Sequence, residues 1–396
     1  MATRKTAVIF GGRTVEHEVS VITAHQLMDA IVAAGFEVLP IYVTKDGDWR
    51  TSPELFNIAV YRDLGALERA LAKARSVVIR PGKTHGGLFT KSGGLFGLGR
   101  LTELPVEVVF PAIHGSFGED GALQGILEWA NIPYVGSDVT ASAVGMDKVL
   151  AKRLLESSGV PVLPGRVLDR GSLDWPETEL EAGVNALGGL PVMVKPTKLG
   201  SSIGVARCAS LEEVREAIEL ALELDSRVLL EPALQDFYEI NCSVLGPPTR
   251  ASACEMPKSK EGFLSFDQKY MRGNGRKSGS KQVDRGTSEG MASLDRILPA
   301  PISERSSKEI RRLAVTVFEL LGASGVARID FLVNRADEQV YFNEINTIPG
   351  SFAFYLWEES GLPFDRLVED LIEIAKARHR ERETTVFAFE TSLLVG

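Results

Sequence analysis

The chain has 396 residues, of which 44% are hydrophobic and 24% charged, and its formal net charge is −9. This length exceeds one compact core of ordinary size, so we expect two or three domains of a soluble globular protein. The acidic balance and the lack of a long Lys/Arg block argue against nucleic acid or an anionic membrane as the main partner.

Cysteine usage and the N-terminus indicate the compartment. The three cysteines, Cys208, Cys242 and Cys254, are dispersed and form no CxxC pair, so neither a disulfide framework nor a zinc site is supported. The first apolar run is too short for a signal peptide, and no stretch approaches the roughly 20 apolar residues of a membrane span. We therefore expect a cytoplasmic protein.

The first third of the chain has the order strand, helix, strand. Residues 7–12 are rich in β-branched side chains, residues 18–35 carry apolar side chains at helical spacing, and residues 37–43 favour a second strand. This order predicts a parallel sheet with a right-handed crossover, which residues 106–115 and a following helix continue. Segment 45–105 is an insertion with a flexible Gly-rich tip, and its pattern predicts nothing further.

The rest of the chain alternates strands and helices in another style. One helix is predicted over 140–159, from a Thr N-cap to Gly159. Further helices are predicted at 211–224, at 303–322 and near the C-terminus, and strands at 190–196, 201–208, 227–232, 238–246, 250–256, 326–333 and 339–346. The strands from 238 onward favour an antiparallel meander. Segment 271–292 is polar and Gly-rich without periodicity, which predicts a long functional loop.

Four polar side chains on the last two predicted strands indicate a metal site. Arg328 and Asp330 are two apart in ARIDFLV, as are Glu344 and Asn346 in QVYFNEIN, so each pair shares one strand face. Mg²⁺ prefers oxygen ligands, usually one or two carboxylates plus substrate phosphates. The pattern favours a magnesium site; the alternative is an exposed ion-pair cluster.

A strand bearing Lys195 leads into the small-residue loop GSSIG, residues 200–204. Small residues let backbone N–H groups approach phosphate oxygens, and a lysine supplies a positive charge. Neither a P-loop nor GxGxxG is present. GSSIG also matches the GxSxG pattern of hydrolases, with Ser202 as nucleophile, but a strand follows it and only His379 comes later. A plain hairpin is the remaining alternative.

Five more polar residues carry weaker signals. Lys148 lies on a predicted helix, and Glu231 and Glu239 flank a short connection that could carry an adenine and its ribose. Glu16 and His114 follow strand ends of the first sheet, where α/β proteins place ligand groups. A surface lysine, an exposed loop carboxylate and a structural histidine stay open as alternatives. With five histidines and none clustered, zinc or iron chemistry is not expected.

Together these segments resemble the D-alanine–D-alanine ligases of the ATP-grasp superfamily. The matching stretches, which span about residues 7–375, are GGRTVEHEVS, PAIHGSFGEDGALQG, GMDKVLAKR, VKPTKLGSSIGV, LLEP with YEINCSVLG, FDQKY, ARIDFLV and NEINTIPG. The resemblance implies an ATP-grasp fold of the α/β and α+β classes. Its domains would be an N-terminal pre-ATP-grasp parallel-sheet domain at 1–136, a central subdomain at 137–231, and a C-terminal subdomain at 232–396 with a mobile loop at 265–292.

The resemblance also implies a reaction. ATP phosphorylates the carboxylate of one D-alanine, the amine of a second D-alanine attacks the acyl phosphate, and loss of phosphate gives the dipeptide used in peptidoglycan synthesis. Two Mg²⁺ ions, with Mn²⁺ as an alternative, would act with ATP as co-substrate. The partners would be small molecules, with a homodimer formed through the N-terminal domain.

The resemblance assigns the candidate residues to roles. The metal ligands would be Asp330, Glu344 and Asn346. ATP would be bound by Lys148, Lys195, Ser202, Glu231, Ala233, Leu234, Glu239 and Lys269. The first substrate would lie against Glu16 and His114, with Arg328 and the Gly350 N–H as oxyanion stabilisers. Tyr270 would close the site onto Ser201 and Glu16. The second substrate would lie against Tyr355 and Leu356.

One position departs from the family pattern. Many members carry a serine that helps bind the second substrate's carboxylate where this chain has Tyr355, and Ser351 is the nearby alternative. A ligase that uses D-serine or D-lactate as second substrate is therefore an alternative function. Tyr270 argues against D-lactate, because in this family a tyrosine there accompanies dipeptide formation. A non-catalytic nucleotide-binding protein is the alternative from another class.

Overall fold

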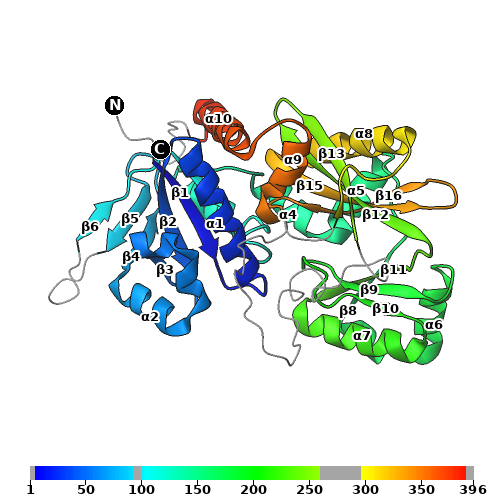
Figure 1. The fold of residues 1–396 in the computed structure, drawn as a ribbon. Coiled ribbons are helices and arrows are strands. Elements are labelled where there is room, and N and C mark those ends of the chain that lie inside the picture. The colour runs from blue at the N-terminus through cyan, green and yellow to red at the C-terminus, as the bar shows by residue number, and fades with distance from the viewer. Residues whose placement is uncertain (1–4, 92–99, 259–295, 389–396) are drawn as a thin grey trace, which may run out of the picture.

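Three β-sheets organise the computed structural model of this chain, which describes residues 5–91, 100–258 and 296–388 (Figure 1). A seven-stranded sheet lies at one end, and a four-stranded and a five-stranded sheet lie at the other. No helix within the described residues is long and apolar enough to cross a membrane.

The first sheet is parallel at its centre. Strand β1 (Lys5–Gly11) pairs in parallel with β2 (Glu37–Val43) and with β7 (Val108–Pro111), and α1 (His17–Ala33) connects β1 to β2. These elements confirm the predicted strand-helix-strand order. Helix α3 (Ala122–Trp129) follows β7, as predicted.

The insertion extends this sheet with antiparallel strands. It contributes β3 (Trp49–Thr51), β4 (Arg75–Arg80), β5 (Gly87–Lys91) and β6 (Leu101–Glu103), besides η1 (Pro53–Phe56), η2 (Ile58–Arg62) and α2 (Leu64–Lys73). The expectation of a parallel sheet thus holds only for β2, β1 and β7, because every added strand pairs antiparallel with its neighbour. Most of the Gly-rich tip, residues 92–99, lies outside the described residues.

The single helix predicted at 140–159 is wrong, because Asp147 divides it into two helices. Asp138 caps α4 (Val139–Met146) through the Ala141 N–H at 2.8 Å, and Asp147 caps α5 (Lys148–Ser157). Asp147 Oδ1 accepts from two backbone N–H groups at 3.1 Å, which favours a fresh helix start at Lys148 over continuation. Gly159 has φ +81°, as its predicted C-terminal position requires.

The second sheet is antiparallel and has the order β10-β9-β11-β8. Its strands are β8 (Arg166–Asp169), β9 (Val192–Pro196), β10 (Ala206–Cys208) and β11 (Arg227–Pro232). Helices α6 (Glu177–Asn185) and α7 (Leu211–Leu224) cover one face (Figure 1). The predicted strand at 201–208 is only β10, because residues 201–204 form a turn. Strand β8, helix α6 and the short η4 (Arg170–Asp174) were not predicted.

The third sheet confirms the antiparallel meander. Its order is β14-β13-β12-β15-β16, from β12 (Phe237–Gly246), β13 (Arg250–Pro257), β14 (Arg296–Ile297), β15 (Gly325–Asn334) and β16 (Val340–Asn346). Helix α8 (Glu304–Leu320) packs on it, and η8 (Gly350–Ala353), α9 (Phe354–Glu359) and α10 (Phe364–Thr384) follow β16. Residues 259–295, with the predicted mobile loop, lie outside the described residues.

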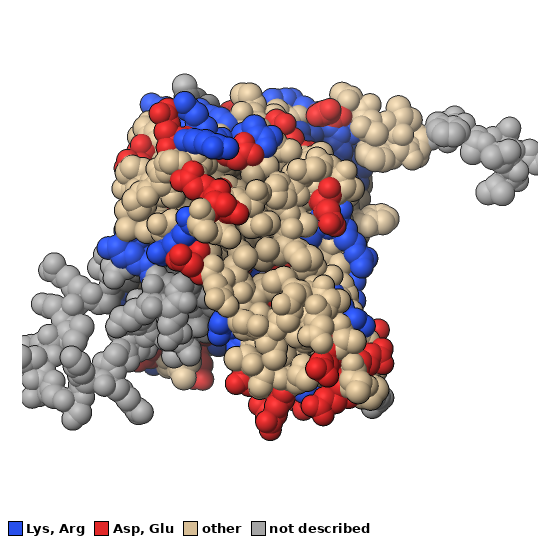
Figure 2. Space-filling model, turned by 90° about the vertical axis from the view of Figure 1, so that its right-hand side faces the viewer, with Lys and Arg blue, Asp and Glu red and all other residues tan. Residues whose placement is uncertain are grey.

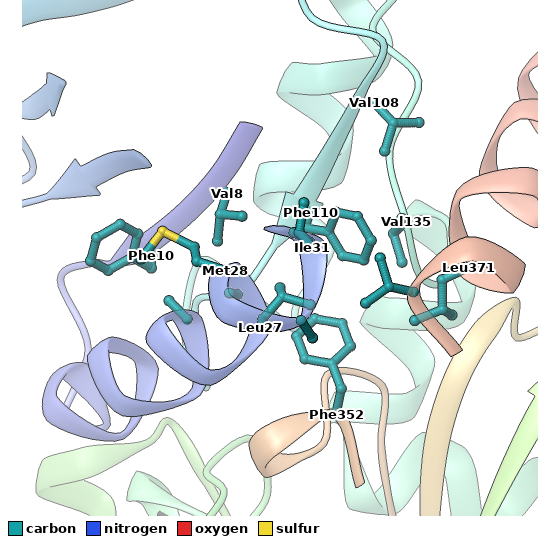
Figure 3. Packing of buried hydrophobic residues seen from close by; sticks show 14 of the residues in the cluster. Val8, Phe10, Leu27, Met28, Ile31, Val108, Phe110, Val135, Phe352 and Leu371 are labelled. Atoms are coloured by element: carbon teal, nitrogen blue, oxygen red, sulfur yellow. The ribbon is translucent and has the colours of Figure 1, made fainter. Parts of the chain in front are cut away.

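Two hydrophobic clusters join segments that are far apart in sequence. Phe352 and Leu371, near the C-terminus, pack with Val8 and Phe110 of the first sheet (Figure 3). Leu155 of α5 is buried among residues of the third sheet, although the predicted boundaries assign it to the central subdomain. Each fully buried Leu or Phe contributes roughly 1.5–3 kcal/mol, so these contacts tie the sheets together. The boundaries at 136 and 231 stay predictions.

Charge on the face that carries the second and third sheets is mixed. Acidic side chains gather at its lower end, where Figure 1 places α6 and α7, and basic side chains alternate with acidic ones at its upper end (Figure 2).

Candidate active site

A cavity of about 660 Å³ lies between the second and third sheets. Its volume is in the range of small-molecule and cofactor sites. Four of the predicted ATP-binding residues line it, namely Lys195, Ala233, Leu234 and Glu239, together with Met193, Arg207, Leu332 and Asn343 among others. Glu231 does not line this cavity.

Glu231 instead neutralises two buried lysines. Its carboxylate is fully buried and pairs with Lys195 Nζ at 2.7 Å and with Lys152 Nζ. Burial alone would raise the pKa of Glu231, but the two lysine charges outweigh it and lower the pKa to about 2. Burial lowers the pKa of Lys152 to about 8. Lys152 was not predicted as a site residue. It lies four residues after Lys148 in GMDKVLAKR, so both side chains share one helix face, and this spacing could have indicated its role.

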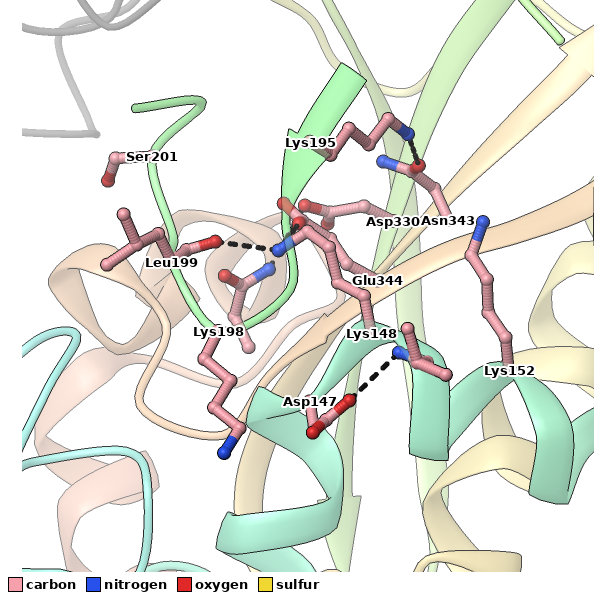
Figure 4. A network of polar contacts seen from close by, with 12 residues as sticks. Asp147, Lys148, Lys152, Lys195, Lys198, Leu199, Ser201, Asp330, Asn343 and Glu344 are labelled. Atoms are coloured by element: carbon pink, nitrogen blue, oxygen red, sulfur yellow. Dashed lines mark hydrogen bonds and ion pairs between the residues drawn. The ribbon is translucent and has the colours of Figure 1, made fainter. Parts of the chain in front are cut away.

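The predicted metal ligands converge on two neighbouring strands. Asp330 pairs in register with Glu344, and Asn346 Nδ2 donates to Asp330 Oδ2 at 3.1 Å. Arg328 holds Asp330 through two bonds of 2.7 and 2.8 Å, and Lys148 Nζ lies 3.1 Å from Glu344 Oε2 (Figure 4). Asp330 is 1% and Arg328 5% exposed, so the alternative of an exposed ion-pair cluster is wrong.

This donor set fits a hard divalent cation. It offers two carboxylates and one amide oxygen, and no cluster of three or more His, Cys, Asp or Glu side chains suited to a metal occurs in the described parts of the chain. Mg²⁺ is commonly bound in this way, since substrate phosphates complete its coordination. The loop carbonyl of Leu199 accepts from Lys148 Nζ at 2.7 Å, which brings the GSSIG turn beside the same carboxylates.

The GSSIG turn reaches the first sheet through Ser201. Ser201 and Ser202 have φ of 53° and 61°, and the Ser201 hydroxyl donates to Glu16 Oε1. A Cβ at Gly115 would lie 2.5 Å from Glu16 Oε2, and one at Gly200 would lie 3.0 Å away, so glycine backbone encloses this carboxylate. Strand β10 follows the turn, so the nucleophile elbow of a serine hydrolase is absent.

His114 is buried next to Gly115, the residue whose backbone lies against Glu16. Its Nε2 lies 2.9 Å from Thr23 Oγ1, and Thr23 Oγ1 also accepts from the Ser351 N–H at 3.1 Å. Burial lowers the pKa of His114 to about 4, and the charge of Arg328 acts in the same direction. His114 is therefore neutral at pH 7.

Glu119 is a buried carboxylate that sequence reasoning missed. It accepts from the Gly115 N–H at 2.8 Å and from the Ile348 N–H at 3.0 Å. Burial raises its pKa to about 8, and Glu16 adds to this effect. The signal in the sequence is a glutamate five residues after His114, in a Gly-rich segment that follows a strand.

Tyr355 lies in a buried polar cluster. Its hydroxyl donates to Glu255 Oε1 at 3.1 Å, and the Arg296 guanidinium lies over its ring, 3.7 Å from the centroid. Arg296 also pairs with Glu255 at 3.0 Å. Burial raises the pKa of Tyr355, so its hydroxyl stays protonated. The side chain of Leu356 is fully buried in a small apolar cluster.

The turn before Tyr355 has an unusual backbone. Ser351, Phe352 and Ala353 follow Gly350 with φ of 55°, 52° and 50°, although each left-handed residue other than glycine costs roughly 1–2 kcal/mol. Such strain tends to occur at functional sites. Lys269 and Tyr270, the predicted lid residues, lie outside the described residues.

Comparisons with known proteins agree with this geometry. The family model described as D-ala D-ala ligase N-terminus matches residues 5–137, and the model described as D-ala D-ala ligase C-terminus matches residues 154–373. D-alanine–D-alanine ligase A from Escherichia coli K12 is 36% identical over 384 residues, which cover 95% of this chain and 96% of that protein.

Solved structures are similar over most of the chain. The D-alanine–D-alanine ligase from Coxiella burnetii superimposes with a TM-score of 0.77 and 29% identity, covering 97% of both chains. The VanG D-Ala:D-Ser ligase from Enterococcus faecalis gives a TM-score of 0.74 and 29% identity, covering 94% of this chain and 99% of that one.

Proposed function

Because the chain belongs to the D-alanine–D-alanine ligase family, we propose that it is an enzyme that joins two D-alanines to D-alanyl-D-alanine while ATP is converted to ADP and phosphate. The observation that carries this proposal is the meeting of Lys148, Lys195, Asp330 and Glu344 beside the nucleotide-sized cavity. A cationic lysine pair and an oxygen-rich metal site are what phosphoryl transfer needs.

ATP would enter the cavity between the second and third sheets. The backbone of Ala233 and Leu234 would hold the adenine and Glu239 the ribose, because all three line the cavity. Lys148, Lys195, Ser202 and, from the loop, Lys269 would bind the phosphates. Glu231 would support phosphate binding indirectly, since its buried carboxylate pairs with Lys195 and holds the lysine in position.

Asp330, Glu344 and Asn346 would hold Mg²⁺, with Mn²⁺ as the alternative. Bound there, the metal would neutralise charge on the phosphoryl group that is transferred. Lys148 would exchange its contact with Glu344 for phosphate oxygens.

The first D-alanine would lie between the first sheet and the GSSIG turn. Glu16 would accept its ammonium group, and neutral His114 would lie near its carboxylate. A carboxylate oxygen of the first D-alanine attacks the γ-phosphorus of ATP, and ADP leaves. Arg328 and the Gly350 N–H would stabilise the charge that develops on the acyl oxygen. The Glu16–Ser201 contact, closed by Tyr270, would exclude water from the acyl phosphate.

The amine of the second D-alanine then attacks the acyl carbon. A tetrahedral intermediate forms, and cleavage of its bond to the phosphate oxygen releases phosphate and leaves the amide. Arg328 again faces the negative oxygen of that intermediate. The dipeptide would serve peptidoglycan synthesis in the cytoplasm, and we propose a homodimer as the assembly.

D-serine is the second candidate for the second substrate. Tyr355 stands where many relatives have a serine, and the similar structure from Enterococcus faecalis is a D-Ala:D-Ser ligase. Tyr270 disfavours D-lactate. A non-catalytic nucleotide-binding protein is disfavoured, because it would not need Glu16, Ser201 and Arg328 beside the metal ligands.

The test is phosphate release from ATP and Mg²⁺ with D-alanine alone, and then with D-alanine plus D-serine or D-lactate, the products being identified by mass. D-alanyl-D-alanine as the dominant product supports the proposal. A preference for a mixed product would mean that only the second-substrate assignment is wrong. If phosphate release does not depend on an added amino acid, the proposal is refuted. Glu344→Ala serves as the inactive control, and Glu309→Gln, a change of an exposed carboxylate on α8, as the matched active control.

A further inference from the structure

One buried carboxylate connects two loops that come from different sheets. Glu119 lies in the segment after β7, and its Oε2 accepts from the Gly115 N–H at 2.8 Å. Its Oε1 accepts from the Ile348 N–H at 3.0 Å, 229 positions away in the chain. Glu119 is 7% exposed, so these bonds are shielded from water.

One of these loops carries His114 and packs against Glu16, and the other carries Gly350. The backbone at Gly115 lies against the carboxylate of Glu16, since a Cβ there would come within 2.5 Å of Glu16 Oε2. Ile348 precedes Pro349 and Gly350, whose N–H is the proposed oxyanion donor. The position of Glu119 therefore sets the distance between the ammonium site and the oxyanion site.

We propose that Glu119 is a positioning residue that aligns the 114–119 loop, which carries His114 and packs against Glu16, with the 348–350 turn, and so aligns the first substrate for phosphoryl transfer. This inference rests on the proposed function of the site. Both carboxylate oxygens are occupied by backbone N–H groups, so Glu119 holds the backbone and does not contact the substrate. Groups that act on a reacting carboxylate must be placed to well under 1 Å, because small displacements cost large factors in rate.

A carboxylate suits this position better than an amide does. Above its pKa of about 8, Glu119 is ionised and accepts a hydrogen bond at each oxygen, and bonds to a charged acceptor are roughly twice as strong as neutral ones. A glutamine would offer one acceptor and would point its NH₂ group at the other backbone N–H. Glu119→Gln therefore keeps the size of the side chain and breaks one of the two connections.

A second contact acts at the same junction. Thr23 Oγ1 accepts from the Ser351 N–H at 3.1 Å and lies 2.9 Å from His114 Nε2. This contact holds the far end of the turn even when Glu119 is changed, so the variant loses alignment at Ile348 without losing the whole interface. We therefore expect Glu119→Gln to fold.

The kinetic arm compares Glu119→Gln with Gln124→Met. Gln124 is a matched control because it is buried on α3, five residues after Glu119, and its side chain donates to Gly118 O at 2.8 Å, a bond that stays within the 118–124 segment. The rate measured is D-alanine-dependent ADP formation with hydroxylamine, whose nitrogen attacks the acyl phosphate and releases phosphate and the hydroxamate. This rate does not require a second amino acid.

At pH 9, where Glu119 is ionised, Glu119→Gln should lower kcat/KM for D-alanine by at least about 10-fold, the usual effect of losing a bond to a charged group. The Kd for ATP should stay within about twofold, because the nucleotide cavity lies between the other two sheets. Gln124→Met should stay within about threefold in both quantities. A kcat/KM for Glu119→Gln within threefold of the unchanged protein overturns the proposal, as does an equal loss in Gln124→Met.

Hydrogen exchange separates this inference from the proposed function. In Glu119→Ala, amide exchange in peptides covering 113–117 and 346–350 should be at least about 10-fold faster than in the unchanged protein and in Gln124→Met. This arm does not depend on which reaction the protein catalyses. Unchanged exchange in both peptides overturns the positioning role, whereas failure to form any dipeptide in the unchanged protein refutes only the proposed function.

Discussion

Removal of the negative charge of Glu231 should destabilise the fold strongly. Glu231 is fully buried and pairs with Lys195 and Lys152, whose side chains are 8% and 7% exposed. In Glu231→Gln the two lysines would face each other across a neutral amide. Breaking a buried ion pair by removing one partner typically costs about 3–5 kcal/mol.

The pKa of Glu231 gives a similar magnitude. It falls from 4.5 to about 2, which corresponds to about 3 kcal/mol at roughly 1.4 kcal/mol per pH unit. Because the folded pKa is depressed, this stabilisation is present above pH 4.5 and is lost as the pH falls toward 2. Above about pH 8 Lys152 begins to lose its proton, so the cost of Glu231→Gln should shrink there.

The assay is urea unfolding of the unchanged protein and of Glu231→Gln at pH 7 and pH 9.5. We expect a loss of about 3 kcal/mol at pH 7 and a smaller loss at pH 9.5. Glu309→Gln, which affects only an exposed pair with Arg312, should cost less than about 1 kcal/mol. A loss below about 1 kcal/mol for Glu231→Gln at pH 7 would refute the reasoning.

Three further predictions concern residues of the candidate active site. Glu344→Ala should abolish turnover by removing a metal ligand, and a near-normal kcat with Mg²⁺ would contradict the metal assignment. Tyr355→Ser should lower any D-serine-containing share of the product at equal D-alanine and D-serine, as measured by mass, because it restores the serine that many family members carry and removes the Tyr355–Glu255 contact; an unchanged product ratio speaks against a role in specificity. His114 has a folded pKa of about 4, so the unfolded chain binds more protons between pH 6.5 and 4 and stability falls as the pH falls. His114→Gln should remove about 3 kcal/mol of that pH dependence in urea unfolding, and equal slopes for both proteins would exclude it.

Local patterns in the sequence predicted most of the elements that carry the site. The alternation in ARIDFLV and QVYFNEIN correctly places Arg328, Asp330, Glu344 and Asn346 on neighbouring strands, since a strand repeats every two residues whatever surrounds it. The strand-helix-strand order likewise predicted the parallel centre of the first sheet. The start of a new helix after Asp147 was not predicted, although the sequence contains its signal, because aspartate is a preferred N-cap.

Other features depend on contacts that no local pattern contains. The resemblance assigns Glu231 to the adenine site, and this role stays a prediction; its ion pairs with Lys152 and Lys195, which lie elsewhere in the chain, could not be predicted from the sequence. Glu119 was not predicted at all, because its role depends on a bond to the Ile348 N–H that forms only when two distant segments meet.

The sequence by itself determined the periodic elements, the family and the kinds of side chain available for phosphoryl transfer. Tertiary structure decided which charges are buried, which partner each has, and how the C-terminal helix packs on the first sheet. The physical reason is the sequence distance over which each effect acts, because propensity and periodicity depend on only a few neighbouring residues. Burial and ion pairing depend on groups that meet only after the chain has folded.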